Sequence, residues 1–281
     1  MAGLPGKLWA FLGLKEEGEL RHVGVGSLSG PWIDLQSVGH SLAFYQSVRD
    51  AGKVGVVLDL QTLGWQTDYP LARQVGLGTM LLQGFWSPGF AIPTLAQQRG
   101  LYAVQQAKAV SYPAGAVIWL DWEKVPPEVT EAQGITWINA WALTVKNGGY
   151  VPGTYIGANQ PISALALYQQ LIYIMHYWRS CSASSVLVAT RGYQMTQTAC
   201  GQMIDGVPVD FDTAGTDALG GQTICALPDA PVTVTTTTDW KPYVDALQAQ
   251  VAVQHDQILA LTNRVSAAET RLQNASKALS D

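Results

Sequence analysis

Residues 116–124 read AVIWLDWEK, and this stretch carries the strongest structural signal in the chain. Its apolar run, from Ala116 to Leu120, is typical of a strand that is buried on both faces in a parallel sheet. The run ends in two acids, Asp121 and Glu123, which stand two positions apart and therefore share one face of the strand. Because barrels of parallel strands carry their functional groups at the carboxyl ends of the strands, the stretch indicates a barrel with a site at that end.

Other segments of the chain have the same apolar and β-branched character. The eight strands that we expect are residues 22–27, 54–60, 80–86, 116–123, 151–156, 176–180, 186–195 and 207–212. Helical patterns lie between several of them, at residues 41–51, 95–110, 130–146 and 162–177. This alternation predicts an α/β fold, a TIM-like (β/α)8 barrel. An open doubly wound sheet is the alternative, but the sequence has no GxGxxG or GxxxxGK[ST] loop to support it.

The composition changes near Pro228, after the last expected strand. Residues 227–240, LPDAPVTVTTTTDW, are rich in Pro and Thr and predict a semi-stiff linker or a short intertwined strand. In residues 241–281 apolar side chains recur every three and four positions, which predicts a coiled coil and a homo-oligomer, trimer or dimer. A single helix packed back on the barrel would need a broader apolar stripe. The expected organisation is a docking or capping segment at 1–20, the barrel at 21–226, the linker at 227–240 and the coiled coil at 241–281.

Charge and hydropathy exclude two classes of partner. The chain has a formal net charge of -5 and no cluster of Lys and Arg, so we expect no nucleic-acid partner. No apolar run reaches the length of about 18 residues that spans a bilayer, so we expect no membrane span. The amino-terminal residues lack the basic start and cleavage site of a signal peptide, which predicts synthesis in a host cytoplasm without secretion through that route.

Histidines and cysteines give no metal or cofactor signature. His22, His40, His176 and His255 are scattered without ligand spacing, so we expect no metal and no cofactor. His176 is more simply explained as a hydrogen-bonded structural residue than as part of a site. The cysteines form no CxxC pair, and we expect free buried thiols, with a single bridge such as Cys200–Cys225 as the alternative.

The two acids of the central stretch suggest acid–base chemistry. Two carboxyl groups that lie close together in a partly apolar site cannot ionise independently, so one keeps its proton while the other stays charged. Cleavage of a glycosidic bond needs such a pair. Trp119 and Trp122 are expected to flank the acids, and the ten Trp and eleven Tyr of the chain fit stacking against sugar rings. Further acids follow expected strands or their neighbours at Asp34, Asp59, Asp210 and Asp212.

Five motifs, in order, resemble one known family. They are AVIWLDWE at 116–123, NGGYVPGTYIG at 147–157, HYWRS at 176–180, YQMTQ at 193–197 and VPVDFDT at 207–213. Over roughly residues 20–222 the chain resembles the glycoside-hydrolase-like domains of bacterial and phage proteins, distant relatives of the family-25 lysozymes that cleave peptidoglycan. The resemblance implies that Glu123 is the general acid and that Asp121 and Asp210 assist it electrostatically. Substrate contacts are then expected from Trp86, Trp122, Tyr155, Trp178, Gln194, Asp212 and Asp34.

The first expected strand departs from the family pattern. The family opens with Gly-Val/Ile-Asp, whereas this chain reads VGVGS at 23–27, with Gly26 where the acid is expected. Asp34 could replace that acid from the following loop. Two hypotheses follow. The chain is a hydrolase directed at peptidoglycan or cell-surface polysaccharide and carried on a phage virion, or it is a catalytically degenerate structural or receptor-binding component of a tail or head fibre. Both imply other virion proteins as partners.

Overall fold

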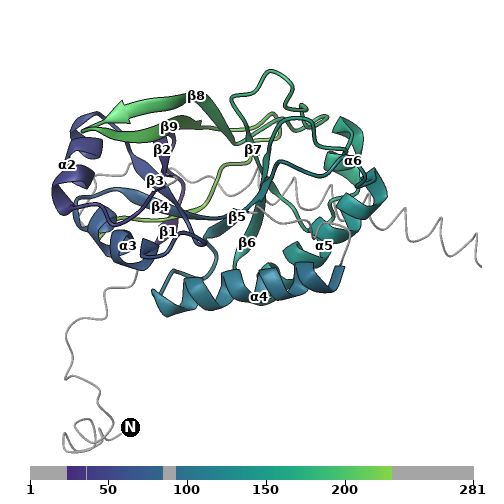
Figure 1. The fold of residues 1–281 in the computed structure, drawn as a ribbon, viewed down its shortest axis with the longest axis horizontal. Helices are drawn as coiled ribbons and strands as arrows, with labels where there is room; N and C mark the ends of the chain where they lie inside the picture. The colour runs from purple at the N-terminus through teal and green to yellow at the C-terminus, as the bar shows by residue number, and fades with distance from the viewer. Residues whose placement is uncertain (1–23, 36, 85–92, 230–281) are drawn as a thin grey trace, which may run out of the picture.

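The strands of the chain close into an eight-stranded barrel (Figure 1), in a computed structural model that describes residues 24–35, 37–84 and 93–229. The wall is made by β2 (Gly30–Leu35), β3 (Gly55–Asp59), β4 (Gly78–Gln83), β5 (Val117–Trp122), β6 (Val151–Ile156), β7 (His176–Arg179), β8 (Met195–Ile204) and β9 (Val207–Ala214). Neighbours from β2 to β8 are parallel. The last strand, β9, is antiparallel to both β8 and β2 and closes the ring. The expected TIM-like barrel is confirmed.

Helices cover only part of this wall. The connections from β2 to β7 contain α2 (Leu42–Asp50), α3 (Trp65–Gln74), α4 (Pro93–Ala109), α5 (Glu131–Asn147) and α6 (Ala164–Gln169). Ser41 caps α2, and Thr130 and Gln133 form a capping box at the start of α5. Residues 180–194, all of them described, connect β7 to β8 through turns and bends without a helix. The β7–β9 side of the barrel therefore lacks the helical cover of the β2–β6 side.

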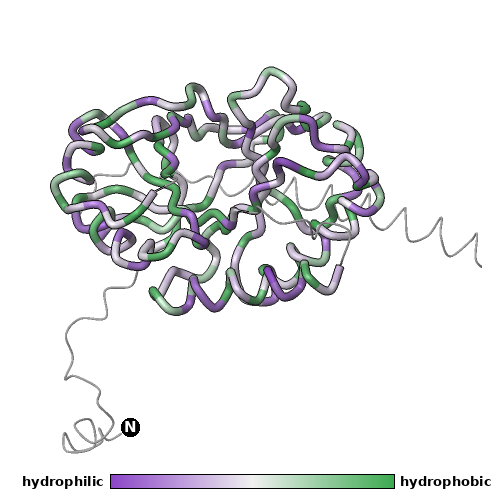
Figure 2. The backbone as a smooth tube through the Cα atoms, viewed as in Figure 1, coloured by the Kyte–Doolittle hydropathy of each residue, from purple (hydrophilic) through white to green (hydrophobic). Residues whose placement is uncertain are grey.

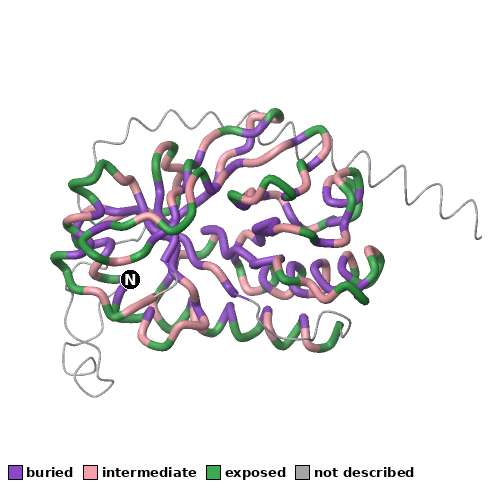
Figure 3. The backbone as a smooth tube through the Cα atoms, turned by 45° about the horizontal axis from the view of Figure 1, so that its top comes forward, coloured by how far each residue is buried: buried purple, intermediate pink, exposed green. Residues whose placement is uncertain are grey.

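Side chains of the strands alternate between two apolar layers. On β5, Val117 and Trp119 belong to the cluster inside the barrel, whereas Ile118, Leu120 and Trp122 belong to the cluster between the barrel and the helices. Figure 3 shows buried residues concentrated along the strands, with exposed residues on the outer sides of the helices. Along α4, hydrophilic and hydrophobic residues alternate, as a helix needs when one side rests on the sheet (Figure 2).

A short additional ladder closes the amino-terminal end of the barrel, which we call the base. Strand β1 (Val25–Gly26) pairs antiparallel with β10 (Cys225–Ala226), and β10 pairs with the first residues of β4. Leu28 and Leu227 pack against the interior cluster from this end. The base thus joins the two ends of the described chain and fills the barrel from below.

An ion pair fastens the outgoing chain to the base. Arg73 on α3 pairs with Asp229, and its Nε donates a hydrogen bond to the carbonyl oxygen of Leu227 at 3.3 Å. The Nη1 atom of Arg73 donates a further hydrogen bond to the Tyr69 hydroxyl at 3.1 Å. The Arg73 side chain is only 6% exposed, so these partners compensate a buried charge.

The sequence located β3 to β7 and three of the helices well, but the first strand was wrong. Residues 22–27 were expected to open the barrel, whereas the first strand of the wall is Gly30–Leu35. The reason is packing. Gly24 and Gly26 offer no side chains, while Trp32 fills the interior and Ile33 fills the layer beneath the helices.

Three further expectations differ from the structure. The expected strand at 186–195 is wrong, because left-handed backbone at Thr190 (φ 63°) and Gly192 (φ 75°) interrupts it, and the strand begins only at Met195. The expected helix at 162–177 is helical only over Ala164–Gln169, since the chain must turn before β7. Helix α3 was not expected. The helix contains Pro70, a residue that is uncommon inside helices.

The predicted segments at both ends, 1–20 and 241–281, lie outside the described residues, as does nearly all of the linker at 227–240. Among the described helices, none combines the length and apolar character needed to cross a bilayer.

Candidate active site

A cavity of about 900 Å³ opens at the carboxyl ends of the parallel strands, which we call the mouth. The mouth is the end opposite the base. Its walls carry five carboxyl groups from four strands or their ends, namely Asp34, Asp59, Asp121, Glu123 and Asp210. Lys124 is the only basic side chain that lines the cavity among the described residues. The cavity is therefore acidic, and burial of these groups decides which of them hold protons.

Strand β5 delivers Asp121 and Glu123 to the cavity, as the sequence predicted. Asp121 is 7% exposed, and its Oδ1 has no hydrogen-bond partner among the described residues. Burial raises the pKa of Asp121 well above its ordinary value, and the charges of Glu123 and Asp34 raise it further. Glu123 is more accessible, with its side chain 25% exposed and an Oε1 that lies 3.2 Å from Lys124 Nζ.

Glycine at position 157 makes room for Glu123. A Cβ atom at Gly157 would lie 2.2 Å from the Cβ and 2.9 Å from the Cα of Glu123. Real side chains do not approach so closely, so a larger residue would displace the backbone that carries the acid. The sequence motif at 147–157 ends on this glycine, and its structural role is to let β6 lie against the end of β5.

Asp34 and Asp210 face each other across the antiparallel pair of β2 and β9. They are direct cross-strand partners, and both accept a hydrogen bond of 3.0 Å from Nε2 of Gln197 on β8. Gly201 N donates a further bond of 2.6 Å to Asp210 Oδ1. Burial, followed by the charges of Asp210 and Asp59, raises the pKa of Asp34 to about 8, although the bond from Gln197 works against this shift. Asp34 therefore holds a proton at neutral pH.

The fifth acid, Asp59, ends β3 and is fixed by its own turn. Its oxygens accept hydrogen bonds from the backbone N–H groups of Gln61 (2.9 Å) and Gly84 (3.3 Å) and from the Thr62 hydroxyl (3.4 Å). These bonds lower the pKa of Asp59, but burial outweighs them and the net shift is upward. The sequence marked Asp59 as a strand-end acid without assigning it to the site, and the structure adds it to the cavity.

Two aromatic residues that the sequence selected, Tyr155 and Trp178, do line the cavity. Their rings meet edge to face with centroids 4.9 Å apart. Trp178 Nε1 donates a hydrogen bond of 2.9 Å to Asp212 Oδ1. Asp212 itself is 1% exposed and lies outside the cavity lining, so the expectation that it contacts substrate is wrong: it anchors Trp178 from below.

Two other expected contacts are also wrong in position. Trp122 is fully buried in the layer between barrel and helices, with its ring centroid 6.0 Å from that of Trp137, because odd and even positions of β5 face opposite ways. Gln194 is buried away from the cavity, where its Nε2 donates to Asp217 Oδ2 at 2.6 Å and its Oε1 accepts from Tyr177 N at 2.6 Å. The glutamine at the site is Gln197, the second of the YQMTQ motif. Trp86 lies outside the described residues.

The first barrel strand was expected to lack an acid, and this expectation is wrong, because the first strand of the wall is β2, which carries Asp34. Gly26 belongs to β1 at the base, where a Cβ would meet the Leu227 side chain at 3.1 Å. It lies at the end of the barrel opposite the cavity. Asp34, on the first strand of the wall, occupies the place where the family pattern expects an acid. The site is therefore not missing this carboxyl group.

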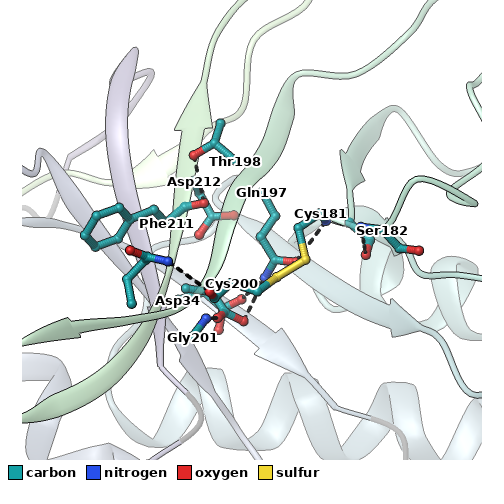
Figure 4. The surroundings of a disulfide bond; sticks show 12 residues. Asp34, Cys181, Ser182, Gln197, Thr198, Cys200, Gly201, Phe211 and Asp212 are labelled. Atoms are coloured by element: carbon teal, nitrogen blue, oxygen red, sulfur yellow. Dashed lines mark hydrogen bonds between the residues drawn. A yellow bond between two sulfur atoms is a disulfide. The ribbon is translucent and has the colours of Figure 1, made fainter.

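The cysteines form a single bridge, which the sequence left open as the alternative to free thiols, but with another pairing than the one expected. Cys181 and Cys200 are joined by a disulfide at the edge of the cavity (Figure 4), and Cys225 is a buried free thiol at the base. The expectation of three free thiols is wrong, and so is the alternative pairing of Cys200 with Cys225. Loop residues 180–194 bring Cys181 beside the β8–β9 hairpin, which no spacing rule could reveal.

His176 is buried in the barrel interior, and neither ring nitrogen has a hydrogen-bond partner among the described residues. Burial lowers the pKa of His176 to about 3, so the ring is neutral. The expectation of a hydrogen-bonded residue is wrong. Its edge-to-face contact with Trp119 makes it part of the aromatic packing instead. In the described part of the chain, no group of three or more His, Cys, Asp or Glu side chains is arranged to hold a metal ion.

A barrel with carboxyl groups gathered at its mouth defines a glycoside-hydrolase-like domain. The comparison with family models agrees: residues 72–257 match the Rv2525c-like, glycoside hydrolase-like domain, and the chain belongs to that family. No curated protein matches the chain.

Solved structures share the fold at low identity. The Mycobacterium tuberculosis Tat-secreted protein Rv2525c, in complex with L-tartrate, is 13% identical, with a TM-score of 0.52 over 66% of this chain and 96% of that one. The same protein in complex with HEPES is 14% identical, with a TM-score of 0.51 over 69% and 98% of the two chains. A protein from B. stearothermophilus is 17% identical, with a TM-score of 0.50 over 66% and 95%. At such identities the likeness shows the fold alone.

Proposed function

We propose that the chain is a glycoside hydrolase directed at peptidoglycan or a cell-surface polysaccharide. The observation that carries this proposal is the distribution of acids around one open cavity. Asp34 and Asp210 stand on β2 and β9, whereas Asp121 stands on β5 and Glu123 directly follows it, on the far side of the ring. A sugar chain that enters the cavity passes between two walls that both carry carboxyl groups. Cleavage of a glycosidic bond needs this arrangement.

The roles within the site follow from accessibility. Glu123 can touch a substrate because a quarter of its side chain is exposed, whereas Asp121 beside it is almost fully buried. Burial, followed by the charge of Glu123, raises the pKa of Asp121, so the buried acid beside Glu123 favours its protonated form. We assign Glu123 as the group that protonates the leaving oxygen. Asp210, on the opposite wall, faces the positive charge that develops on the sugar ring.

Tyr155 and Trp178 complete the proposed glycan site. Both line the cavity, and Trp178 is held by its bond to Asp212, so the aromatic wall is rigid before a ligand arrives. Tyr155, which is 8% exposed, is the ring that can meet the apolar face of a sugar, and the fully buried Trp178 supports it. A degenerate barrel that only binds glycans remains the second hypothesis, but its motive was the absent acid on strand one, and Asp34 supplies that acid.

We also propose that the chain acts as a homo-oligomer on a phage virion, attached to other virion proteins. Support comes from the heptads at 241–281, which predict a trimeric or dimeric coiled coil. The Cys181–Cys200 disulfide fits a protein that works outside a reducing cytoplasm. A monomer by analytical ultracentrifugation at micromolar concentration would contradict the oligomer.

The decisive experiment assays reducing ends released from purified bacterial cell walls. Wild-type protein should release them, and Glu123→Gln should lose about 10²- to 10⁴-fold in rate, the usual contribution of a general acid. Glu128→Gln is the matched control, because Glu128 is exposed in a loop and lies outside the cavity lining. Equal traces for wild type and Glu123→Gln would sink the hydrolase, and binding of the walls without release would favour the fibre component.

A further inference from the structure

Gln197 is the best-connected side chain of the mouth, although neither the sequence motifs nor the proposed roles assign it a function. It is 4% exposed and lines the cavity from β8. We propose that Gln197 is a positioning residue that holds Asp34 and Asp210 in place, and that the Cys181–Cys200 disulfide orients it, so that the site is assembled only when this bridge is formed. The inference rests on the proposed hydrolase function and deepens it.

The oxygen end of the Gln197 amide is fixed by two donors. Its Oε1 accepts a hydrogen bond from the Tyr155 hydroxyl at 3.0 Å and another from the backbone N–H of Cys181 at 3.1 Å. Since both groups donate, only the oxygen of the amide can face them, and the nitrogen must point the other way. Tyr155 and Cys181 thus decide which end of the amide meets the acids.

The nitrogen end of the Gln197 amide donates hydrogen bonds to both Asp34 and Asp210. Nε2 has two hydrogens, and it donates one to Asp34 Oδ2 and one to Asp210 Oδ2, each at 3.0 Å. All hydrogen-bonding capacity of the amide is then used. Two carboxyl groups that are direct cross-strand partners are held side by side by one neutral donor. The bond to Gln197 also lowers the pKa of Asp34, which limits the upward shift caused by burial.

The disulfide joins a segment of β8 whose pairing with β9 is irregular, so the regular strand ladder does not fix the position of this segment. The ladder between β8 and β9 is irregular from Gln197 to Gln202, so regular pairing is lost around Cys200 and Gly201. Gly201 N nevertheless donates to Asp210 Oδ1 at 2.6 Å. The bridge ties this irregular segment to Cys181, whose N–H orients Gln197 (Figure 4). On this side of the barrel, where residues 180–194 form no helix, the bridge is a covalent connection between the β7–β8 loop and β8.

Reduction would release both attachments at once. A dithiol reductant supplies two electrons and two protons, the Cys181–Cys200 bond breaks to give two thiols, and the reductant closes to its own disulfide. The Cys181 N–H and the Gly201 N–H then lose their covalent connection, and the carboxyl pair loses its fixed geometry. The expected consequence is a hydrolase that is latent in a reducing compartment and assembled in an oxidising one.

The first test replaces Gln197 in the full chain. Gln197→Glu removes both N–H donors and adds a negative charge, so the pKa of Asp34 should rise, and the pH profile of kcat/KM should move to higher pH. The rate should fall by about a hundredfold, the cost expected for a misplaced reacting group. Tyr155→Phe, which removes one donor only, should fall less. Gln66→Glu, on the exposed face of α3, should match wild type.

The second test changes the bridge. Dithiothreitol should lower the rate of wild type, reoxidation should restore it, and the Cys181→Ser/Cys200→Ser double variant should show the reduced rate with or without dithiothreitol. Cys225→Ser should stay as sensitive as wild type, because Cys225 lies at the base. Full activity after a thiol assay has shown the bridge to be open would overturn the inference.

A readout without turnover separates this inference from the hydrolase proposal. ¹³C-carboxyl NMR of Asp-labelled protein follows the titration of Asp34 directly. The midpoint of that titration should rise in Gln197→Glu and after reduction. If the midpoint does not move in either case, Gln197 does not position the acid, whatever the protein cleaves. If it moves as expected while no wall substrate is cleaved, the positioning role stands and the hydrolase proposal fails.

Discussion

The two ends of the barrel differ in their side chains: the base is mainly apolar, and the mouth is acidic. At the base, Trp32, Leu28 and Leu227 pack apolar side chains into the interior, and the buried charges of Arg73 and Arg191 are each paired with an acid. At the mouth, five carboxyl groups line a cavity, and burial raises the pKa of three of them, Asp34, Asp59 and Asp121. Apolar packing favours folding, whereas crowded acids oppose it. The difference teaches that this protein keeps its stability at one end and its chemistry at the other.

The largest expected effect is a loss of stability at the base. Trp32 is fully buried, its Nε1 donates to the Leu28 carbonyl oxygen at 3.1 Å, and Gly55 and Gly78 leave room for its ring. Trp32→Ala should lower the free energy of unfolding by about 3–5 kcal/mol, measured by urea denaturation. Leu63→Ala, at a side chain that is 95% exposed, is the control and should change it little. A cost below about 1 kcal/mol for Trp32→Ala would break the comparison.

A smaller loss is expected at the mouth when Gly157 is filled. Gly157→Ala places a methyl group against Glu123, so the end of β5 must shift. Overpacking of this kind costs about 1–3 kcal/mol of unfolding free energy. The rate of wall hydrolysis should fall more steeply than stability, because the displaced residue is the proposed acid. Gly52→Ala, at a turn position with open space around it, should affect stability through its backbone alone and leave the rate unchanged.

Removing an acid from the mouth should stabilise the protein. The pKa of Asp34 is raised from 3.8 to about 8, so the folded protein binds this proton more tightly than the unfolded chain does. That stability is complete below the unfolded pKa and is lost as the pH rises through about 8. Asp34→Asn cannot ionise, so at pH 8 it should unfold at a higher temperature than wild type. Thermal unfolding from pH 5 to 9 checks this, and a wild-type curve that does not fall with pH would contradict it.

The smallest effect is expected at Cys225. Burial raises the pKa of this thiol to about 12, so it stays protonated, and its Sγ lies 3.3 Å from the Gly26 carbonyl oxygen. Cys225→Ser preserves a donor at that distance and should cost about 1 kcal/mol or less. Activity should be unchanged, since the base does not contact the cavity. A large loss of activity in a stably folded Cys225→Ser variant would show that the two ends are coupled.

The central stretch explains why part of this architecture could be predicted. Parity along β5 placed Asp121 and Glu123 on one face, and an apolar run of that length has few alternatives to a buried strand. The same parity puts Trp122 on the other face, and applying it would have removed Trp122 from the expected site. The capping box at Thr130 likewise marked the start of α5 from local chemistry alone.

Other features depend on contacts that no local pattern contains. VGVGS at 23–27 and GPWIDL at 30–35 both look like strands, and only packing between two apolar layers selects the second and brings Asp34 to the mouth. The role of Gln197 requires three segments to meet, and the Cys181–Cys200 bridge depends on how residues 180–194 fold back. These contacts join residues that lie far apart in the sequence. The sequence could therefore identify Asp34 and Asp210 as candidate acids, but not Gln197 as the residue that binds both.

The ladder of β1 and β10 has a mechanical consequence. Val25 pairs with Ala226 and Gly26 with Cys225, so the first and last described residues leave the barrel side by side, at the end away from the cavity. A pull transmitted through both ends of the chain loads this short ladder and the Arg73–Asp229 contact first. The wall strands that carry the acids lie outside that load path. A force applied to both ends of the described chain would therefore be borne at the base, while the cavity at the mouth keeps its shape.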